Sequence, residues 1–160
     1  MSVKFCASLL STATRTFTNH SRNMSKTACV ILAPGAEEME FTISADVLRR
    51  AGIAVTVAGL HGAEEVKCSN DIIIKPDGAL EKLSDNKYDV IVMPGGLGGS
   101  KAMAESKLMC EFLKRQESEG RKIAAICAAP IALAAHEIGV GKSLTSYPSV
   151  KDQLASKYNS

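Results

Sequence analysis

The sequence of 160 residues has no tryptophan, and aromatic residues of all kinds make up only 4% of it. Proteins that bind single-stranded nucleic acid stack bases on aromatic side chains, so this shortage argues against such a function. The net charge of +2 is too small for a protein that binds a phosphate backbone. No apolar run approaches the roughly 20 residues of a membrane-spanning helix. We therefore expect neither nucleic acid nor a membrane as a partner.

The cysteines lack the close spacing of metal-binding motifs. They are Cys6, Cys29, Cys68, Cys110 and Cys127, and no two of them form a Cys-x-x-Cys pair. Structural zinc sites use such short spacings, so we expect no metal site of that kind. An odd number of widely spaced cysteines is typical of free thiols in a reducing compartment.

Residues 1–24 contain eight serines or threonines, three basic residues and no acidic residue. An acid-free, amphipathic start that carries arginine is typical of a mitochondrial transit peptide, so residues 1–24 are predicted to be an extension of that kind. The alternative is an extension that carries no address. Met24 can serve as a second start, which would leave the protein in the cytoplasm. The predicted localisation is therefore mitochondrial, cytoplasmic or both.

Beyond this extension, apolar runs alternate with amphipathic stretches that end at glycine, as strands and helices do. The expected strands span 28–33, 53–58, 72–74, 89–93, 122–126 and 143–146, and the expected helices span 37–51, 105–119, 128–136 and 150–158. The alternation indicates one α/β domain over residues 25–160, a three-layer sandwich with a mainly parallel sheet. Ligands of such sheets bind beyond the carboxyl ends of the strands.

Cys127 follows the expected strand 122–126 and precedes an alanine-rich helix. Its neighbours at −2 and +2 are Ala125 and Ala129, and a nucleophile on a sharp strand-to-helix turn needs such small residues. A thiol at a helix N-terminus is also expected to have a lowered pKa, because the helix dipole favours the thiolate. The alternative is an inert cysteine buried in the core.

Glu40 falls within the apolar arc of the helix 37–51, together with Ile43 and Leu48, and is expected to point toward the core. A carboxyl group that keeps its proton can donate a hydrogen bond to a thiolate or exchange a proton during catalysis. The alternative is a first-turn acid that only complements the helix dipole, and this role suits Glu37 and Glu38 better.

The glycine-rich stretch Pro-Gly-Gly-Leu-Gly-Gly-Ser at 94–100 follows the expected strand 89–93. It matches neither a P-loop nor a dinucleotide-binding fingerprint, so nucleotide binding has little support. Gly95 and Gly96 would let backbone N–H groups face a ligand, as an oxyanion hole requires. The alternative is an ordinary glycine turn.

Four separated blocks of the chain closely resemble the protein deglycases of the PfpI superfamily. The blocks are VILAPGAEEME (30–40), DVLRRAGIAVTVAGL (46–60), DVIVMPGG (89–96) and IAAICAAP (123–130). The resemblance extends from residue 26 to about residue 158. It implies a class I glutamine-amidotransferase-like fold of the flavodoxin-like kind.

The resemblance also assigns roles to residues. It implies that Cys127 is the reactive cysteine, that Glu40 hydrogen-bonds it, and that Gly95, Gly96 and Ala128 bind an oxyanion through their backbone N–H groups. It implies no metal and no organic cofactor. The implied substrates are methylglyoxal, glyoxal and the adducts that they form with proteins.

Further properties of the family follow as expectations. Its cysteine is oxidised to the sulfinate and is regarded as a sensor of oxidative stress, and chaperone activity is ascribed to the family. Its members are homodimers in which the helix matching 37–51 lies at the interface, so we expect a homodimer through Glu37–Ala51.

Three departures from the family pattern bear on these expectations. Tyr147 occupies a position where the family often has histidine, and a tyrosine is a poor base at neutral pH. Asn70 replaces an arginine, so an ion pair with Asp46 across a dimer is not available. The family continues with further strands and a closing helix beyond the residue that matches Ser160, so one layer of the sandwich is expected to be incomplete.

The sequence therefore predicts a cofactor-independent glyoxalase or protein deglycase that uses the Cys127 thiolate and takes part in the oxidative-stress response. Two alternatives remain open. One is a redox sensor or chaperone in which oxidation of Cys127 is the function. The other is an inactive truncated isoform.

Overall fold

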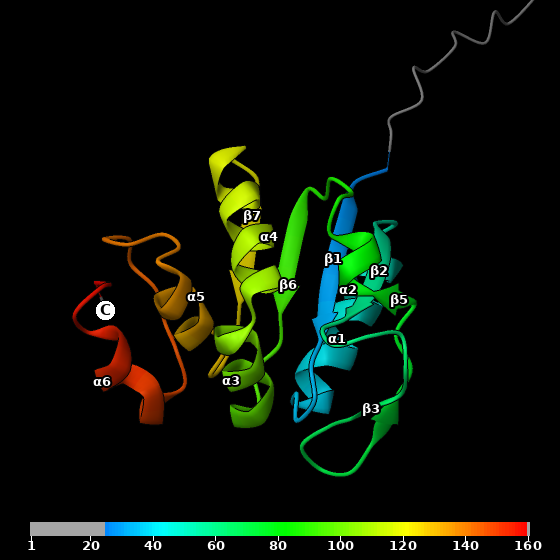
Figure 1. The fold of residues 1–160 in the computed structure, drawn as a ribbon, viewed down its shortest axis with the longest axis horizontal. Coiled ribbons are helices and arrows are strands. Elements are labelled where there is room, and N and C mark those ends of the chain that lie inside the picture. The colour runs from blue at the N-terminus through cyan, green and yellow to red at the C-terminus, as the bar shows by residue number, and fades with distance from the viewer. Residues whose placement is uncertain (1–24, 160) are drawn as a thin grey trace, which may run out of the picture.

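The computed structural model describes residues 25–159 of the chain (Figure 1). The elements follow in the order β1 (Thr27–Leu32), α1 (Glu38–Arg50), β2 (Ala54–Gly59), β3 (Val66–Lys67), β4 (Ile73–Ile74), β5 (Gly78–Ala79), α2 (Leu80–Leu83), β6 (Val90–Met93), α3 (Leu97–Glu105), α4 (Lys107–Ser118), β7 (Lys122–Ala125), α5 (Pro130–His136), the 3₁₀ helix η1 (Pro148–Val150) and α6 (Lys151–Leu154). The predicted transit peptide, residues 1–24, lies outside the described residues. No helix within residues 25–159 combines the length and the apolar character needed to cross a membrane.

The strand β1 lies at the centre of a five-stranded sheet with the order β5-β2-β1-β6-β7. All neighbouring strands in this sheet run parallel. Residues 28–32 of β1 are completely buried, which explains why this run is continuously apolar. The mainly parallel α/β sheet predicted from the sequence is confirmed.

The two faces of the sheet have different covers. Cys29 and Ile31 of β1 pack in one apolar cluster with residues of α2, α3, α4 and α5. Val30 and Leu32 point to the opposite face and pack in a second cluster with α1 and β3. The alternation along β1 therefore separates two layers of helices, as a three-layer sandwich requires. Figure 1 shows α3, α4 and α5 gathered on the β6–β7 side of the molecule.

The α1 face of the sheet is covered unevenly. Helix α1 packs on β1 and β2, whereas Val90 and Val92 of β6 are half-buried and Ala124 of β7 is exposed. Among residues 25–159, no helix covers β6 and β7 on this face of the sheet. On the opposite face Ile91 is completely buried. Within the described residues, the α1 face of the sheet is therefore covered less over β6 and β7 than over β1 and β2.

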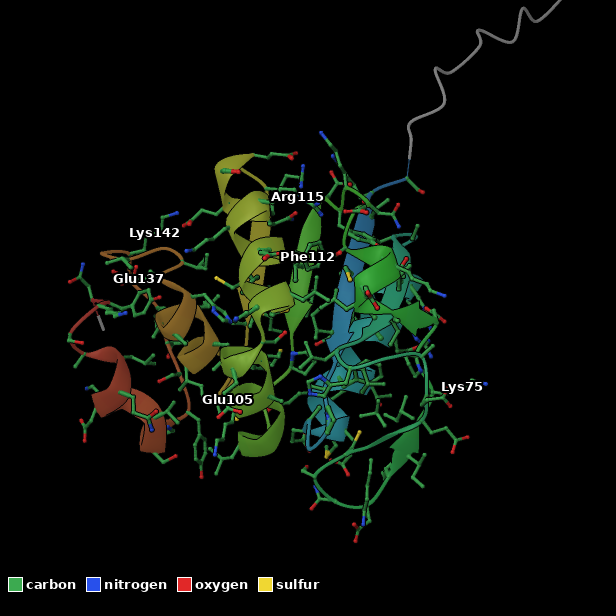
Figure 2. The ribbon with its side chains drawn as sticks, viewed as in Figure 1. Lys75, Glu105, Phe112, Arg115, Glu137 and Lys142 are labelled. Atoms are coloured by element: carbon green, nitrogen blue, oxygen red, sulfur yellow. The ribbon has the colours of Figure 1, made fainter. Side chains whose placement is uncertain are left out.

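Helix α4 covers the opposite face through a single apolar stripe. Phe112 is buried and meets Tyr88 edge-on, with ring centroids 6.1 Å apart. The Arg115 guanidinium lies 5.6 Å from the centre of the Phe112 ring, toward the surface (Figure 2). Gln116, also buried, donates to the carbonyls of Tyr88 and Lys122. These contacts fix the start of β7, which leads to Cys127.

Two local predictions are wrong. Residues 94–100 are not one loop, because α3 begins at Leu97 and includes Gly98 and Gly99, which pack closely on the segment before α1. The helix expected over 105–119 is confirmed as α4, which Ser106 caps by accepting the Met109 amide at 3.2 Å. Residues 143–146 do not form a strand of the sheet, because Ser143 and its neighbours bond to 157–159 instead.

Candidate active site

Glu40 reaches the carboxyl end of the sheet from the first turn of α1. Glu37 is the N-cap of this helix, and its carboxylate accepts the Glu40 amide at 2.7 Å. The Glu40 carboxylate extends across to the loop after β6, where Oε2 accepts the Gly95 amide at 2.7 Å. Two carboxylates of one helical turn thus have separate roles, since Glu37 caps the helix and Glu40 joins it to the glycine loop.

The burial of α1 differs from the prediction. The buried residues of the helix are Glu38, Phe41 and Ala45, and its exposed apolar residues are Met39, Ile43 and Val47. The predicted apolar arc was therefore assigned to the wrong side of the helix. Glu40 does not point into the core. It is half-buried against the Gly95 loop.

Cys127 lies in a sharp turn between β7 and α5. Its φ of +59° is in the left-handed region, which non-glycine residues adopt at a cost of roughly 1–3 kcal/mol. The backbone is held on both sides, because the Ile126 amide donates to Met93 O at 3.2 Å and the Tyr147 amide donates to Cys127 O at 2.7 Å. The predicted strand-to-helix turn is therefore present, although α5 itself begins only at Pro130.

The thiol of Cys127 is half-buried among three polar groups. The Glu40 carboxyl group hydrogen-bonds the sulfur, and the backbone N–H groups of Gly96 and Ala128 also donate to it. Burial and then the Glu40 contact raise the pKa of the Cys127 thiol above its ordinary value of 9.0, while the two N–H groups lower it less. The expected lowered pKa is thus wrong, because burial of the thiol and then the neighbouring Glu40 carboxyl group oppose a negative charge on the sulfur.

The glycines of the loop are required by close backbone approaches. A Cβ on Gly95 would lie 2.7 Å from both Cys127 Cβ and Glu40 Oε2. A Cβ on Gly96, whose φ is +81°, would lie 2.4 Å from Gly35 O. Gly95 uses its N–H for Glu40, so only Gly96 and Ala128 of the three predicted oxyanion donors direct this group to the sulfur.

Glu38 is a buried carboxylate whose role the sequence did not indicate. Ser69 Oγ donates to it at 2.7 Å, and the Asn70 backbone amide donates at 2.8 Å. The Ser69 hydrogen bond is the largest cause that lowers its pKa from 4.5 to about 2. Its spacing from Phe41 and Ala45 was a signal of burial, since the three residues share one face. Glu38 therefore joins the start of α1 to the β3–β4 hairpin.

Tyr147 and Asn70, which depart from the family pattern, both lie close to the candidate site or to its supporting helix. Tyr147 is half exposed and is bonded to Cys127 through its backbone. Asn70 bonds Glu38, and Asp46 pairs with Arg50 of its own helix at 2.7 Å.

Cys29 and Cys68 are buried. Within residues 25–159, no group of three or more histidine, cysteine or acidic side chains is placed to hold a metal ion.

Comparisons with known proteins agree with this arrangement. The family model described as "DJ-1/PfpI family" matches residues 26–160. Protein dj-1beta of Drosophila melanogaster is 65% identical over 136 residues, which are 85% of this chain and 73% of the relative. Its crystal structure superposes with a TM-score of 0.84 over 84% of this chain and 73% of that one.

Two further relatives bear on the chemistry. The glutathione-independent glyoxalase DJR-1.2 of Caenorhabditis elegans is 42% identical over 81% of this chain and 68% of its own. The structure described as Toxoplasma gondii DJ-1, oxidized, is 32% identical and has a TM-score of 0.78 over 85% of this chain and 75% of that one. On the match over residues 26–160 and these similarities, the chain belongs to the DJ-1/PfpI family.

Proposed function

We propose that the chain is a cofactor-independent glyoxalase and protein deglycase that acts through Cys127. The observation that carries this proposal is the convergence of the Glu40 carboxyl group and the Gly96 and Ala128 N–H groups on the Cys127 sulfur. A proton acceptor beside a thiol and two donors beside the same atom are the parts that thiol addition to a carbonyl needs. The glyoxalase named among the relatives supports this reaction class.

The proposed reaction with methylglyoxal starts when the Cys127 sulfur bonds to the aldehyde carbon. The thiol proton passes to Glu40, and the carbonyl oxygen becomes an oxyanion that the Gly96 and Ala128 N–H groups stabilise. Glu40 returns the thiol proton to this oxyanion, which gives a hemithioacetal. Glu40 then removes the proton from the former aldehyde carbon and delivers it to the neighbouring carbon, while the hydroxyl proton passes to the oxygen of that neighbouring carbon, which leaves a lactoyl thioester. Water cleaves this thioester, releases lactate and restores the thiol. The balance is one methylglyoxal and one water for one lactate.

An early adduct between a dicarbonyl and a protein amine follows the same path after a different first step. The sulfur bonds to the carbon that carries the nitrogen, the carbon–nitrogen bond breaks, and the amine leaves with the proton that Glu40 took from the thiol.

The test is lactate production from methylglyoxal in the absence of glutathione. We expect the purified chain to form lactate faster than an equal concentration of a free thiol, and Cys127→Ser to abolish this excess. Cys110→Ser is the matched control, because Cys110 is half-buried on α4 away from the glycine loop. A wild-type rate no higher than that of the free thiol would contradict the proposal.

A redox-sensing role is the second candidate, and the same donors favour it. The Gly96 and Ala128 N–H groups would stabilise the negative charge of an oxidised sulfur, and one similar solved structure is described as oxidized. Mass spectrometry after graded peroxide treatment tests this role. Sulfinate at Cys127 before any other cysteine is expected, and earlier oxidation of Cys68 or Cys110 would contradict it.

We further propose that two copies of the chain associate through α1. The exposed apolar residues Met39, Ile43 and Val47 recur every four positions and therefore form one stripe. Each is more than half exposed, which is unusual for three large apolar side chains on one helix face. A second copy of the same helix would bury this stripe.

A further inference from the structure

The first turn of α3 lies directly on the segment that precedes α1. A Cβ on Gly99 would lie 2.8 Å from Ala36 Cα and 3.0 Å from Ala36 N. Ordinary van der Waals contact begins near 3.4 Å, so even a methyl group does not fit between Gly99 and Ala36. The Gly99 amide also donates to Gly35 O at 3.1 Å. We refer to this contact of Gly99 with residues 35–36 as the α3 junction.

The two helix layers of the sandwich meet at the α3 junction. Ala36 packs in the apolar cluster on the α1 face of the sheet. Met103 of α3 packs in the cluster on the opposite face, together with Ala129, which lies two residues after Cys127. Glu40 therefore reaches the thiol from one layer, whereas the turn that carries the thiol belongs to the other.

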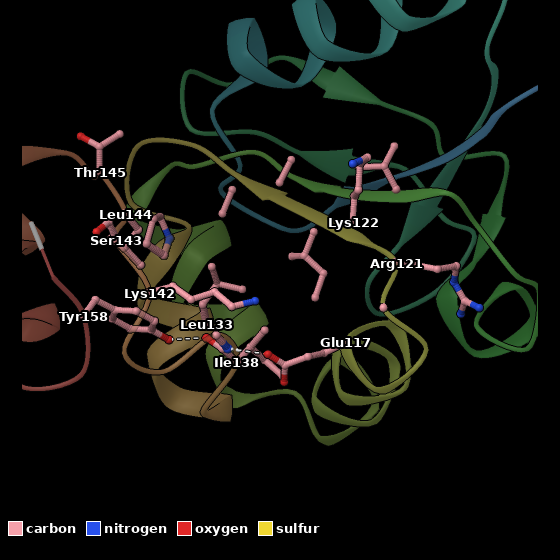
Figure 3. A pocket seen from close by; sticks show the side chains of 17 residues that line it. Glu117, Arg121, Lys122, Leu133, Ile138, Lys142, Ser143, Leu144, Thr145 and Tyr158 are labelled. Atoms are coloured by element: carbon pink, nitrogen blue, oxygen red, sulfur yellow. Dashed lines mark hydrogen bonds between the residues drawn. The ribbon is translucent and has the colours of Figure 1, made fainter.

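The layer that contains the Cys127 turn is held together by contacts between its helices. Nε2 of His136, the last residue of α5, lies 2.8 Å from Met103 O of α3, within hydrogen-bond distance. Just beyond α5, the Gly139 amide donates to Glu117 Oε1 of α4 at 2.7 Å, as Figure 3 shows. A change at the α3 junction should therefore displace α1 more than it displaces the Cys127 turn.

The segment before α1 is bonded on its other side to the β3–β4 hairpin. The Gly35 amide donates to Lys67 O and the Ser69 amide donates to Ala36 O, both at 2.9 Å. The hairpin is a two-stranded sheet of its own, separate from the five-stranded sheet. It can follow the segment when the segment moves, and Glu40 then moves with its helix.

We propose that Gly99 is a positioning residue for the candidate active site, because its lack of a side chain sets the spacing between α1 and the Cys127 turn. At this spacing the Glu40 carboxyl group reaches the sulfur from one layer, while the Gly96 and Ala128 N–H groups donate to it from the other. The assignment rests on the proposed function only in taking Glu40 as the group that carries the proton.

The first test is the pH midpoint of Cys127 alkylation by iodoacetamide in Gly99→Ala. The added methyl group should force the α3 junction apart by about half an ångström, so that Glu40 withdraws from the sulfur. Because the Glu40 contact raises the pKa of the thiol, the midpoint should fall toward that of Glu40→Gln. An unchanged midpoint would overturn the proposal.

Gly98→Ala is the matched control in the same helix. Alanine favours a helix at both positions, but Gly98 is exposed, and the nearest neighbour of its added Cβ would be Gly35 Cα at 3.3 Å. Its midpoint should stay close to that of the wild type. Equal shifts in the two variants would show that the contact with Ala36 is not the cause, and the proposal would fail.

The double variant Gly99→Ala/Glu40→Gln distinguishes positioning of Glu40 from a general loosening of the site. If Gly99 acts through Glu40, its replacement should add nothing once the carboxyl group is gone, so the double variant should have the midpoint of Glu40→Gln. Additive shifts would show that Gly99 affects the thiol by another route and would contradict the assignment.

Ala36→Gly keeps the test decisive if Gly99→Ala does not fold. It adds no bulk and removes a buried methyl group at the α3 junction, which should loosen the segment before α1. The midpoint should fall in the same direction as in Gly99→Ala, but by less. A wild-type midpoint in Ala36→Gly would then overturn the proposal.

Lactate formation from methylglyoxal separates a failure of this assignment from a failure of the proposed function. In Gly99→Ala, kcat should fall at least about tenfold with little change in KM, because the displaced group transfers protons. Gly98→Ala should keep the wild-type values. A wild type that forms no lactate would contradict the proposed function, and the alkylation midpoints would still decide the role of Gly99. An active wild type with normal kcat in Gly99→Ala would overturn the assignment.

Discussion

The Gly95 amide donates to Glu40 Oε2 at 2.7 Å, which joins the loop after β6 to the first turn of α1. A second bond runs in the opposite direction, because the Glu37 amide donates to Gly95 O at 3.1 Å. The pair fixes the Glu40 carboxylate beside Cys127. It also occupies the Gly95 N–H, so two donors remain for a developing oxyanion, those of Gly96 and Ala128.

Replacement of Gly95 by alanine should disrupt the site at its narrowest point. The added Cβ would lie 2.7 Å from both Cys127 Cβ and Glu40 Oε2, so the two groups must separate. Since a misplacement of about 1 Å can reduce a rate about 100-fold, we expect Gly95→Ala to lose methylglyoxal turnover by that order.

Gly120→Ala is the matched control for backbone strain. Gly120 has φ +67° but no neighbour within 4 Å of an added Cβ, so its replacement should lower the melting temperature slightly without a loss of turnover. Wild-type turnover in Gly95→Ala would show that the close approach does not matter for activity.

The titration of Cys127 should depend on Glu40. The Glu40 contact raises the pKa of the thiol, whereas the Gly96 and Ala128 N–H groups lower it. Glu40→Gln removes the negative charge, so the thiolate should form at lower pH. Alkylation by iodoacetamide, followed between pH 6 and 10, should have its midpoint above 9.0 in the wild type and at a lower pH in the variant. Coincident midpoints would contradict the coupling.

The same variant separates acid–base catalysis from simple thiol reactivity. Glutamine keeps a polar group of the same shape at position 40 but cannot exchange a proton, so turnover should fall by about 100-fold or more. Peroxide oxidation of Cys127 should survive the change. Glu40→Leu removes the polar group as well and should weaken both reactions.

Much of the fold was predictable because long buried strands leave a simple pattern. Residues 28–32 of β1 are all apolar, as burial on both faces requires, and the predicted strand ends located the segments that carry Gly95 and Cys127. Of the short strands, only β4 was predicted, as the strand 72–74. The strands β3, β4 and β5 have two residues each, too few for any periodicity.

The sequence indicated which residues meet at the candidate site better than it indicated how they are arranged. Cys127 and Glu40 stood out because Cys127 follows an expected strand and Glu40 falls within the apolar arc predicted for the helix 37–51. The arc itself was misread, since the apolar residues Ile43 and Val47 are exposed and the acid Glu38 is buried. When a helix has apolar residues on two faces, its sequence does not show which face is buried. Here the buried face is decided by the loop that carries Ser69 and Asn70, because both residues bond to Glu38.

One charged side chain on α1 should prevent the association of two copies. Val47→Asp places a carboxylate in the exposed apolar stripe and should convert a dimer into a monomer in light scattering after gel filtration. Val140→Asp is the matched control, because Val140 and Val47 are exposed by 55% and 56%. A wild-type monomer, or equal effects of the two changes, would contradict the proposed interface.

The first residues should act as a mitochondrial address. A fluorescent protein fused to residues 1–23 is expected to enter mitochondria, because this stretch carries arginine and no acidic residue. A fusion that begins at Met24 should remain in the cytosol. Arg15→Glu/Arg22→Glu should abolish import in the longer fusion. Identical distributions of the two fusions would show that residues 1–23 carry no address.

The Glu38 contacts should make stability depend on pH in the acid range. The Ser69 and Asn70 hydrogen bonds hold the folded pKa of Glu38 at about 2, below its ordinary value of 4.5. The folded state therefore binds the proton more weakly than the unfolded state does. The stabilisation is complete above about pH 4.5 and is lost as the pH falls toward 2.

Glu38→Gln removes this ionisation while it keeps the shape of the side chain. Urea unfolding at pH 7, 5 and 3 should show the wild type more stable than the variant at pH 7 and 5, with the gap narrowing at pH 3. Glu111→Gln, at an exposed position of α4, should show almost no gap at any pH. Other carboxylates with a lowered pKa, such as Asp89 beside Lys26, are present in the wild type and in both variants. Their contributions therefore cancel when the free energies of unfolding are compared. A gap that stays constant from pH 7 to 3 would mean that Glu38 contributes by shape alone, and that its charge does not anchor the hairpin to α1.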